Sequence, residues 1–193
     1  MKRFKPISAK GIKTYLLKDR KSKVCVNGFA KPLQKNKTFN DFLNSLPNIL
    51  AADNLKKVAS GIISSHKNNK VVAIGIGAHV IKVGLSPIVI DLMELGVVSA
   101  VAMNGACIVH DFEIAYAGMT SEDVDVEIGS GEFGMSKETG ELLNSAIKNG
   151  VKKGWGIGKS VGELIKNSKY PYKDLSILAA GARLGIPVTV HVA

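Results

Sequence analysis

The centre of the chain alternates unbroken aliphatic runs with longer amphipathic stretches. Residues 71–76 and 97–103 are apolar except for Ser99, which is typical of strands buried in a parallel sheet. Small residues follow each run, and apolar residues at helical spacing then predict helices over 78–95 and 106–116, with Pro87 beginning a second segment of the first helix. The order strand, helix, strand, helix predicts an α/β fold with a parallel sheet and right-handed crossovers.

The last part of the chain predicts a loop, three helices and a strand. Residues 117–135 are rich in glycine and acidic residues without a period, which predicts a mobile loop. Ser136 is expected to cap a helix that ends at Gly150. A short helix is expected after the glycine-rich stretch 151–160, and a helix over about 173–184 then leads into an apolar strand, 186–193, on which the sequence stops. A buried strand is an unusual end, so we expect the sequence to be truncated at its C-terminus.

The N-terminal part differs from the rest in pattern and charge. Residues 38–62 have a helical period that Pro47 interrupts, which predicts two helices. Residues 1–37 alternate short apolar pairs with lysines and are interpreted as a basic arm. We therefore predict an arm over 1–37 and one α/β domain over 38–193.

Charge is concentrated at the start of the chain. Residues 1–70 contain 16 Lys and Arg against 3 Asp and Glu, whereas residues 71–193 contain 10 against 13, for a net charge of +10. Such an arm can contact nucleic acid or an acidic partner. A solvated lysine surface, or a clamp onto a neighbouring subunit, is the simpler explanation, because no zinc-finger spacing or aromatic RNA-binding signature is present. Nucleic acid is therefore not the partner that we expect.

Cysteine usage and hydropathy favour a cytoplasmic protein. The chain has two cysteines, Cys25 and Cys107, and its four histidines lack metal-ligand spacing, so neither a disulfide scaffold nor a zinc site is expected. No apolar run follows the N-terminal charges, and none reaches the ~20 residues of a membrane span. We predict a soluble cytoplasmic protein without a metal.

Two small-residue turns mark the candidate binding site. Gly75-Ile76-Gly77-Ala78 follows the first strand, where backbone N–H groups can hold a pyrophosphate, although Val80 stands where the dinucleotide fingerprint has a third glycine. Asn104-Gly105-Ala106 ends the next strand. Because parallel strands end at the same edge of a sheet, we expect the two turns to form a crevice. Close packing of helix on strand is the alternative explanation of these glycines.

Polar side chains near these turns are the candidate reactive groups. His110, Asp111 and Glu113 lie in an otherwise apolar helix, and a histidine beside a carboxylate can act as a general base. A satisfied core histidine and a surface aspartate explain them equally well. His79, directly after the first turn, can contact a ligand or pack, and the direction of His191 stays open.

Two further motifs are interpreted as structural. The stretch 151–160 contains Gly158-Lys159-Ser160, but Lys153 stands where a phosphate-binding loop has its first glycine, so a flexible loop is the better interpretation. Cys107 precedes His110 by three residues and could form a thiol and base pair. A buried cysteine acting as a small apolar residue is far commoner.

The segment from Val71 to Gly118, together with DLSILAAGARLGIPVTVHVA at the end, resembles the deoxyhypusine synthase family. In that family a small-residue turn precedes a helix, a second small-residue motif and an acidic pair follow the next strand, and a later strand begins Ile-Pro-Val. Here the second motif is Asn104-Gly105-Ala106-Cys107, His110-Asp111 replaces the acidic pair, and Ile186-Pro187-Val188 begins the last strand.

The resemblance implies a Rossmann-like, doubly wound sheet, a homotetramer, and NAD-dependent transfer of an aminobutyl group from a polyamine through a lysine imine. That lysine lies beyond the last strand in the family, so no residue here maps to it. His110 and Asp111 are the predicted catalytic residues. The predicted NAD-binding residues are Gly75, Gly77, Ala78, His79, Asn104, Gly105 and Ala106. The alternative is a non-catalytic nucleotide-binding module whose basic arm contacts an acidic partner or RNA.

Overall fold

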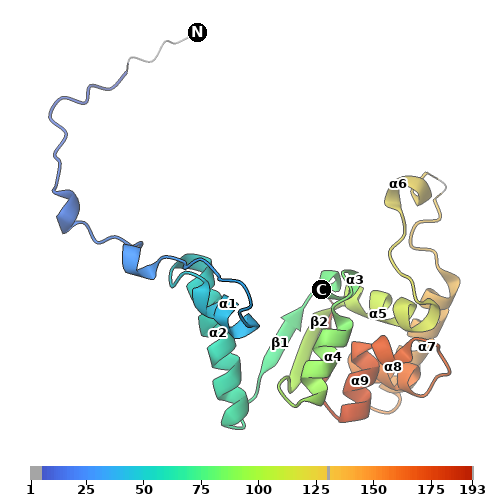
Figure 1. The fold of residues 1–193 in the computed structure, drawn as a ribbon. Coiled ribbons are helices and arrows are strands. Elements are labelled where there is room, and N and C mark those ends of the chain that lie inside the picture. The colour runs from blue at the N-terminus through green and yellow to red at the C-terminus, as the bar shows by residue number, and fades with distance from the viewer. Residues whose placement is uncertain (1–5, 130, 193) are drawn as a thin grey trace. The chain divides into compact units, whose positions relative to one another are not determined.

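The computed structural model describes residues 6–129 and 131–192, and the chain divides into two units (Figure 1). Met1–Ser60 is the N-terminal unit and Gly61–Ala193 the C-terminal unit. This division falls inside a helix, later in the chain than the boundary predicted between residues 37 and 38. The predicted boundary itself stays a prediction.

The N-terminal unit is built from short elements without a core. Its elements are η1 (Leu17–Asp19), η2 (Val26–Gly28), α1 (Phe39–Ser45) and the first part of α2 (Leu50–Lys67). The start of α1 is fixed by a capping box, in which the Asp41 N–H donates to Thr38 Oγ1 at 3.2 Å and the Thr38 N–H donates to the Asp41 carboxylate at 2.9 Å. The two helices predicted around Pro47 are confirmed. None of residues 6–60 is buried.

A parallel sheet of three strands organises the C-terminal unit. The strands are β1 (Ala73–Ile76), β2 (Ala100–Asn104) and β3 (Val188–His191), in the order β1-β2-β3. Ile74, Val101 and Val188 lie in one row across the sheet, because each is the register partner of the next. The predicted α/β class and the parallel sheet are confirmed.

In the described part of the C-terminal unit, eight helices follow or connect the strands. The predicted helix over 78–95 is interrupted at Gly84, whose φ of 80° is left-handed, and Pro87 lies at the start of its second segment, as expected. The predicted loops 117–135 and 151–160 each contain a helix or the start of one. The helices are α3 (Ala78–Lys82), α4 (Ser86–Glu94), α5 (Gly105–Ala117), α6 (Val124–Glu127), α7 (Lys137–Val151), α8 (Ile157–Lys166), η3 (Lys173–Leu175) and α9 (Ile177–Leu184).

The core lies against one face of the sheet. Val101, Met103 and Val188 belong to a single cluster of buried side chains that also includes residues of α3, α4, α5, α8 and α9. The opposite face is exposed or half-buried and consists of small or polar residues: Ala73, Gly75, Ala100, Ala102, Thr189 and His191. Right-handed crossovers that always move in one direction place their helices on one face, whereas a doubly wound sheet reverses its strand order. The predicted Rossmann-like, doubly wound arrangement is therefore not confirmed.

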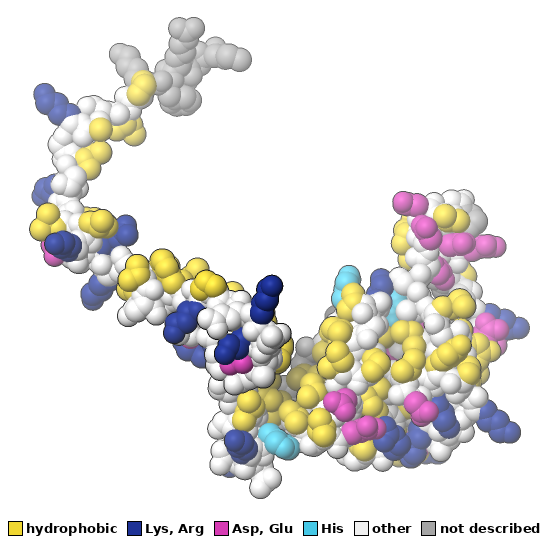
Figure 2. Space-filling view, viewed as in Figure 1, with side chains coloured by type: hydrophobic (Ala, Val, Ile, Leu, Met, Phe, Trp, Pro, Cys, Tyr) yellow, Lys and Arg dark blue, Asp and Glu magenta, His cyan; other side chains and the backbone are white. Residues whose placement is uncertain are grey.

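The segment between α5 and α7, residues 119–136, is called the acidic loop. It contains Glu122, Asp123, Asp125, Glu127 and Glu132 and no Lys or Arg. It projects from the helical layer and carries α6 (Figure 1), and acidic side chains gather over α6 in the space-filling view (Figure 2).

Candidate functional site at the carboxyl edge of the sheet

The two small-residue turns lie next to each other. β1 ends at Ile76 and Gly77 is the N-cap of α3, while β2 ends at Asn104, the N-cap of α5. A Cβ built on Gly77 would lie 3.9 Å from the side-chain nitrogen of Asn104. The Cys107 thiol of α5 donates to the Ile76 carbonyl across 3.7 Å. The juxtaposition of the two turns that the sequence predicts is present in the structure.

Local contacts fix the second turn. Asn104 Oδ1 accepts a hydrogen bond from the Cys107 N–H at 3.2 Å, which caps α5. A Cβ on Gly105 would lie 2.8 Å from Val192 Cγ1, so a side chain there would displace the end of the chain. All seven predicted cofactor residues lie within three positions of the end of β1 or β2: Gly75, Gly77, Ala78, His79, Asn104, Gly105 and Ala106. Their binding of a cofactor stays a prediction.

A chain of hydrogen bonds connects His110 to Glu113 on α5. Thr120 Oγ1 lies 2.7 Å from His110 Nδ1 and donates to Glu113 Oε2 at 2.5 Å. Thr139, in the first turn of α7, donates to the other carboxylate oxygen at 3.0 Å. The His110 and Glu113 side chains are 18% and 21% exposed. The half-buried Glu113 carboxylate therefore orients His110 through Thr120. It also holds Thr120, near the start of the acidic loop, and Thr139, just beyond its end, against α5.

The surroundings of His110 favour its neutral form. Burial lowers the pKa of the His110 imidazole below its ordinary value of 6.5, and the charges of Lys82 and His79 on α3 lower it further. The Glu113 carboxylate acts in the opposite direction and raises this pKa. Since the net shift is downward, the imidazole is neutral at pH 7 and can accept a proton. Lys82 thus brings a positive charge from α3 close to the imidazole of His110 on α5.

Asp111 occupies a different environment from His110. Its side chain is 1% exposed and accepts hydrogen bonds from Ser176 Oγ at 2.5 Å, the Ile177 N–H at 2.9 Å and the Leu178 N–H at 3.2 Å. Burial raises the pKa of this carboxyl to about 6, against the lowering effect of the same hydrogen bonds. The carboxylate therefore holds the start of α9 against α5. These contacts favour a structural role, and a catalytic role for Asp111 stays a prediction.

The remaining candidates from the sequence are structural. Cys107 is fully buried, and burial raises the pKa of its thiol, which favours the inert thiol. The glycine-rich stretch after Lys153 is not a loop throughout, because α8 begins at Ile157. His191 Nε2 lies 2.9 Å from Thr189 Oγ1 on the uncovered face of the sheet. Within residues 6–129 and 131–192, no group of three or more His, Cys, Asp or Glu side chains is arranged to hold a metal ion.

Part of this site can be predicted from the sequence. The spacing of three between His110 and Glu113 on a helix indicates that they lie on one face, but this spacing does not by itself show that Glu113 orients His110. Thr120 follows the helix in an aperiodic segment, and Thr139 is a polar residue on an amphipathic helix, so neither carries a signal. Lys82 lies three residues after His79 on α3, and its effect on His110 depends on how α3 packs against α5.

Comparisons with known proteins give little support for any family. No family model matches the chain, and no curated protein matches it. A solved structure of ArgZ, an arginine dihydrolase from the ornithine-ammonia cycle in cyanobacteria, matches with a TM-score of 0.48 and 19% sequence identity. The match covers 75% of this chain and 19% of that chain, so this chain spans about a fifth of the length of ArgZ.

These findings correct the resemblance drawn from the sequence. No family model and no curated protein matches the chain, so the predicted membership of the deoxyhypusine synthase family is wrong. The predicted function, NAD-dependent aminobutyl transfer from a polyamine, is wrong with it, and the predicted homotetramer has no support. The alternative, a nucleotide-binding module with a basic arm, gains no support either. NAD binding then rests on the two turns alone and stays a prediction.

The location of the protein is tested in one respect. In the part of the chain that the structure describes, no helix has both the length and the apolar character needed to cross a membrane. The cytoplasm remains a prediction.

Proposed function

We propose that the C-terminal unit carries a proton-transfer site in which His110 is the base, acting on a small anionic substrate at the carboxyl edge of the sheet. The observation that carries this proposal is the hydrogen-bond chain from Glu113 through Thr120 to His110. Oriented histidines of this kind are the most frequent general bases in enzymes.

The proton count along the chain assigns the tautomer of His110. Thr120 has one hydroxyl proton, and it donates this proton to Glu113. The Thr120 oxygen then accepts from Nδ1 of His110, which must carry the ring proton. Nε2 keeps a free lone pair on a side chain that is 18% exposed. This arrangement supports a neutral imidazole that accepts a proton at Nε2.

One cationic side chain near the base favours an anionic substrate. Lys82 lowers the pKa of His110, so its positive potential reaches the imidazole, although the Glu113 carboxylate acts in the opposite direction. A nearby cation raises the local concentration of anions. The two turns add backbone N–H groups at the same edge, which suits a carboxylate or a phosphate group.

The tautomer can be tested by nitrogen NMR of the His110 ring. We expect the Nδ1–H tautomer and a pKa below 6.5 in the native protein. Thr120→Val should remove the tautomer preference, because it deletes the hydroxyl and keeps the shape. Thr189→Val is the matched control, since its hydroxyl contacts His191 instead, 2.9 Å from Nε2. An Nε2–H tautomer in the native protein would contradict the proposal.

An NMR titration of the His110 ring also tests how the charges of Glu113 and Lys82 affect its pKa. Glu113→Gln removes the carboxylate that raises the His110 pKa, so this pKa should fall. Lys82→Met removes a cation that lowers it, so this pKa should rise. Shifts in the reverse directions would mean that His110 lies elsewhere relative to these groups.

Proton transfer itself can be tested by exchange in D₂O. The protein is incubated with a panel of small carboxylates and phosphate monoesters, and loss of C–H signals is followed by proton NMR. One or more compounds should exchange with the native protein and about 100-fold more slowly with His110→Gln. His191→Gln should exchange at the native rate. Exchange that persists in His110→Gln would remove His110 as the base.

A further inference from the structure

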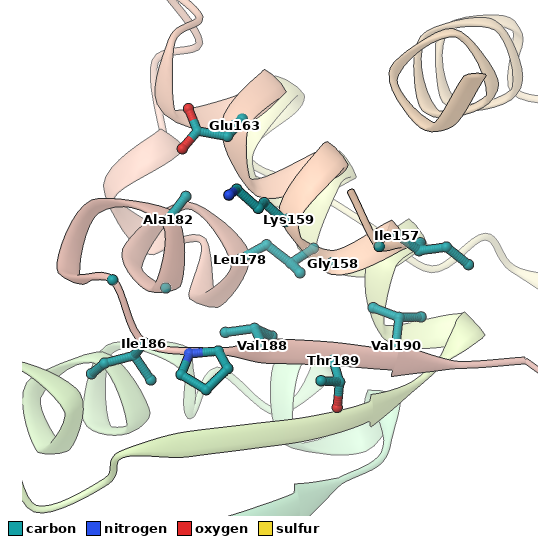
Figure 3. A pocket seen from close by; sticks show the side chains of 14 residues that line it. Ile157, Gly158, Lys159, Glu163, Leu178, Ala182, Ile186, Val188, Thr189 and Val190 are labelled. Carbon is teal, nitrogen blue, oxygen red and sulfur yellow. The ribbon is translucent and has the colours of Figure 1, made fainter. Parts of the chain in front are cut away.

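A groove separate from the His110 site runs along β3 under α8 and α9 (Figure 3). Its volume is about 510 Å³, which lies in the range of small-molecule sites. Residues 186–190 form its floor, where Val188 and Val190 point toward the helices and Thr189 points away (Figure 3). The first turn of α8 and the Leu178 to Ala182 face of α9 form the opposite wall.

Glycines explain why this space is hollow. A Cβ on Gly158 of α8 would overlap the Val188 carbonyl, so α8 lies with its backbone directly on β3. A Cβ on Gly181 of α9 would lie 3.0 Å from the Ile186 carbonyl oxygen. Glycines 156 and 185 also line the groove and contribute no side chain to it. The helices are held close to the strand, but the volume beside them is left open.

One cationic side chain enters this apolar space. Lys159 lines the groove, and its ammonium lies 4.9 Å from the centre of the Trp155 ring. Among residues 6–129 and 131–192, no carboxylate lies within 4.0 Å of that ammonium.

The acidic residue in the groove already has hydrogen-bond partners. Glu163 accepts hydrogen bonds from Lys166 at 3.1 Å and from Asn167 at 3.0 Å. These partners and the charge of Lys159 lower the pKa of Glu163 despite the opposing effect of burial. Glu163 is therefore ionised and hydrogen-bonded to Lys166, which leaves Lys159 as the charged side chain of the lining that can meet a ligand.

We propose that this groove binds an aliphatic monocarboxylate, with the hydrocarbon chain along the half-buried Ala182, Ile186 and Val190 and the carboxylate on Lys159. An apolar channel with a single unpaired cation at its wall matches a ligand with an apolar body and a single negative charge. The site uses none of the residues of the His110 site, so the two proposals stand independently.

Calorimetric titration of the full chain with butanoate, hexanoate and octanoate tests the apolar part. Each added buried methylene should tighten binding about fourfold. Octanamide, which has the same tail without the charge, should bind about tenfold more weakly than octanoate. Affinity that does not change with chain length would overturn the proposal.

Variants test the position of the ligand. Lys159→Ala should weaken octanoate binding about tenfold and abolish the preference over octanamide. Lys153→Ala is the matched control, because Lys153 lies 4.6 Å from the same Trp155 ring but does not line the groove. Equal losses in both variants would indicate unspecific surface charge and overturn the assignment.

Two more variants distinguish binding in the groove from binding elsewhere on the protein. Ala182→Leu should fill the groove and remove binding of both octanoate and octanamide, with folding checked by circular dichroism. If this variant does not fold, the contrast between Lys159→Ala and Lys153→Ala decides. His110→Gln should bind octanoate as the native protein does. Loss of binding in His110→Gln would place the ligand at the carboxyl edge of the sheet and overturn the groove.

Discussion

At the residue scale, adjacent positions on one helix perform unrelated tasks. His110 and Asp111 are about 100° apart around α5, so their side chains leave the helix in different directions. His110 contacts Thr120 of the acidic loop, whereas Asp111 contacts the start of α9. The sequence shows that both are polar residues in an apolar helix. Only the packing of the acidic loop and of α9 against α5 distinguishes His110, the candidate base, from Asp111, which accepts hydrogen bonds from the start of α9.

Removal of the Asp111 carboxylate should destabilise the fold. Asp111→Ala leaves the Ser176 hydroxyl and two backbone N–H groups buried without an acceptor, which costs about 3 kcal/mol in the free energy of unfolding. Asp91→Ala, at an exposed position of α4, should change it by less than about 0.5 kcal/mol. Denaturant unfolding curves measure both. Equal stability of the two variants would show that Asp111 does not hold α9.

The Asp111 effect should also depend on pH. Burial raises the carboxyl pKa from 3.8 to about 6 on folding, so folded protein binds this proton more tightly than unfolded protein. The resulting stabilisation is complete below pH 3.8 and is lost as the pH rises through about 6. The cost of Asp111→Ala should therefore be larger at pH 4 than at pH 7, relative to Asp91→Ala at each pH.

At the scale of elements, the sequence predicts periodic segments well and contacts between segments poorly. The strands, the helices on both sides of Pro47 and the helix after Ser136 all form, because hydrophobic period and breakers are local signals. Ser136 lies at the predicted N-cap, yet its hydroxyl contacts Thr139 Oγ1 at 3.0 Å and makes no cap. The glycines at the start of α8 predict a loop from the local pattern. In the structure Gly158 permits close contact of α8 with β3, and a contact between distant segments leaves no local signal.

The close contact of α8 with β3 gives a direct test. Gly158→Ala places a methyl group on the Val188 carbonyl, so α8 must move away at a cost of about 2 kcal/mol in the free energy of unfolding. Gly140→Ala, inside α7, is the control, because nothing lies within 4 Å of a Cβ at that position. Thermal unfolding of both variants decides. A neutral Gly158→Ala would mean that α8 does not rest on the strand backbone.

At the scale of the whole molecule, the sheet of the C-terminal unit is covered on one side. Parallel sheets are normally buried on both faces, and the small residues of the uncovered face, such as Ala73 and Ala102, are compatible with burial. The sequence predicted the strands and their direction. It did not predict that helices would gather on one face, because that follows from the strand order, which local patterns do not contain.

The basic arm should contribute little to stability. No residue in 6–37 is buried, and the core lies in the C-terminal unit. Deletion of residues 1–37 should therefore change the free energy of unfolding by less than about 0.5 kcal/mol, as measured in urea. A larger loss would show that the arm belongs to the folded structure and would move the predicted domain boundary.

The attachment of the acidic loop to Glu113 has a practical consequence. Thr120 and Thr139 meet at one carboxylate, so the loop starts and finishes at the same anchor. We therefore expect that the length of the acidic loop can change without moving α5 or α7. A reporter peptide inserted after Gly129, beyond the end of α6, would thus leave this anchor in place, so this segment is suited to labelling the protein.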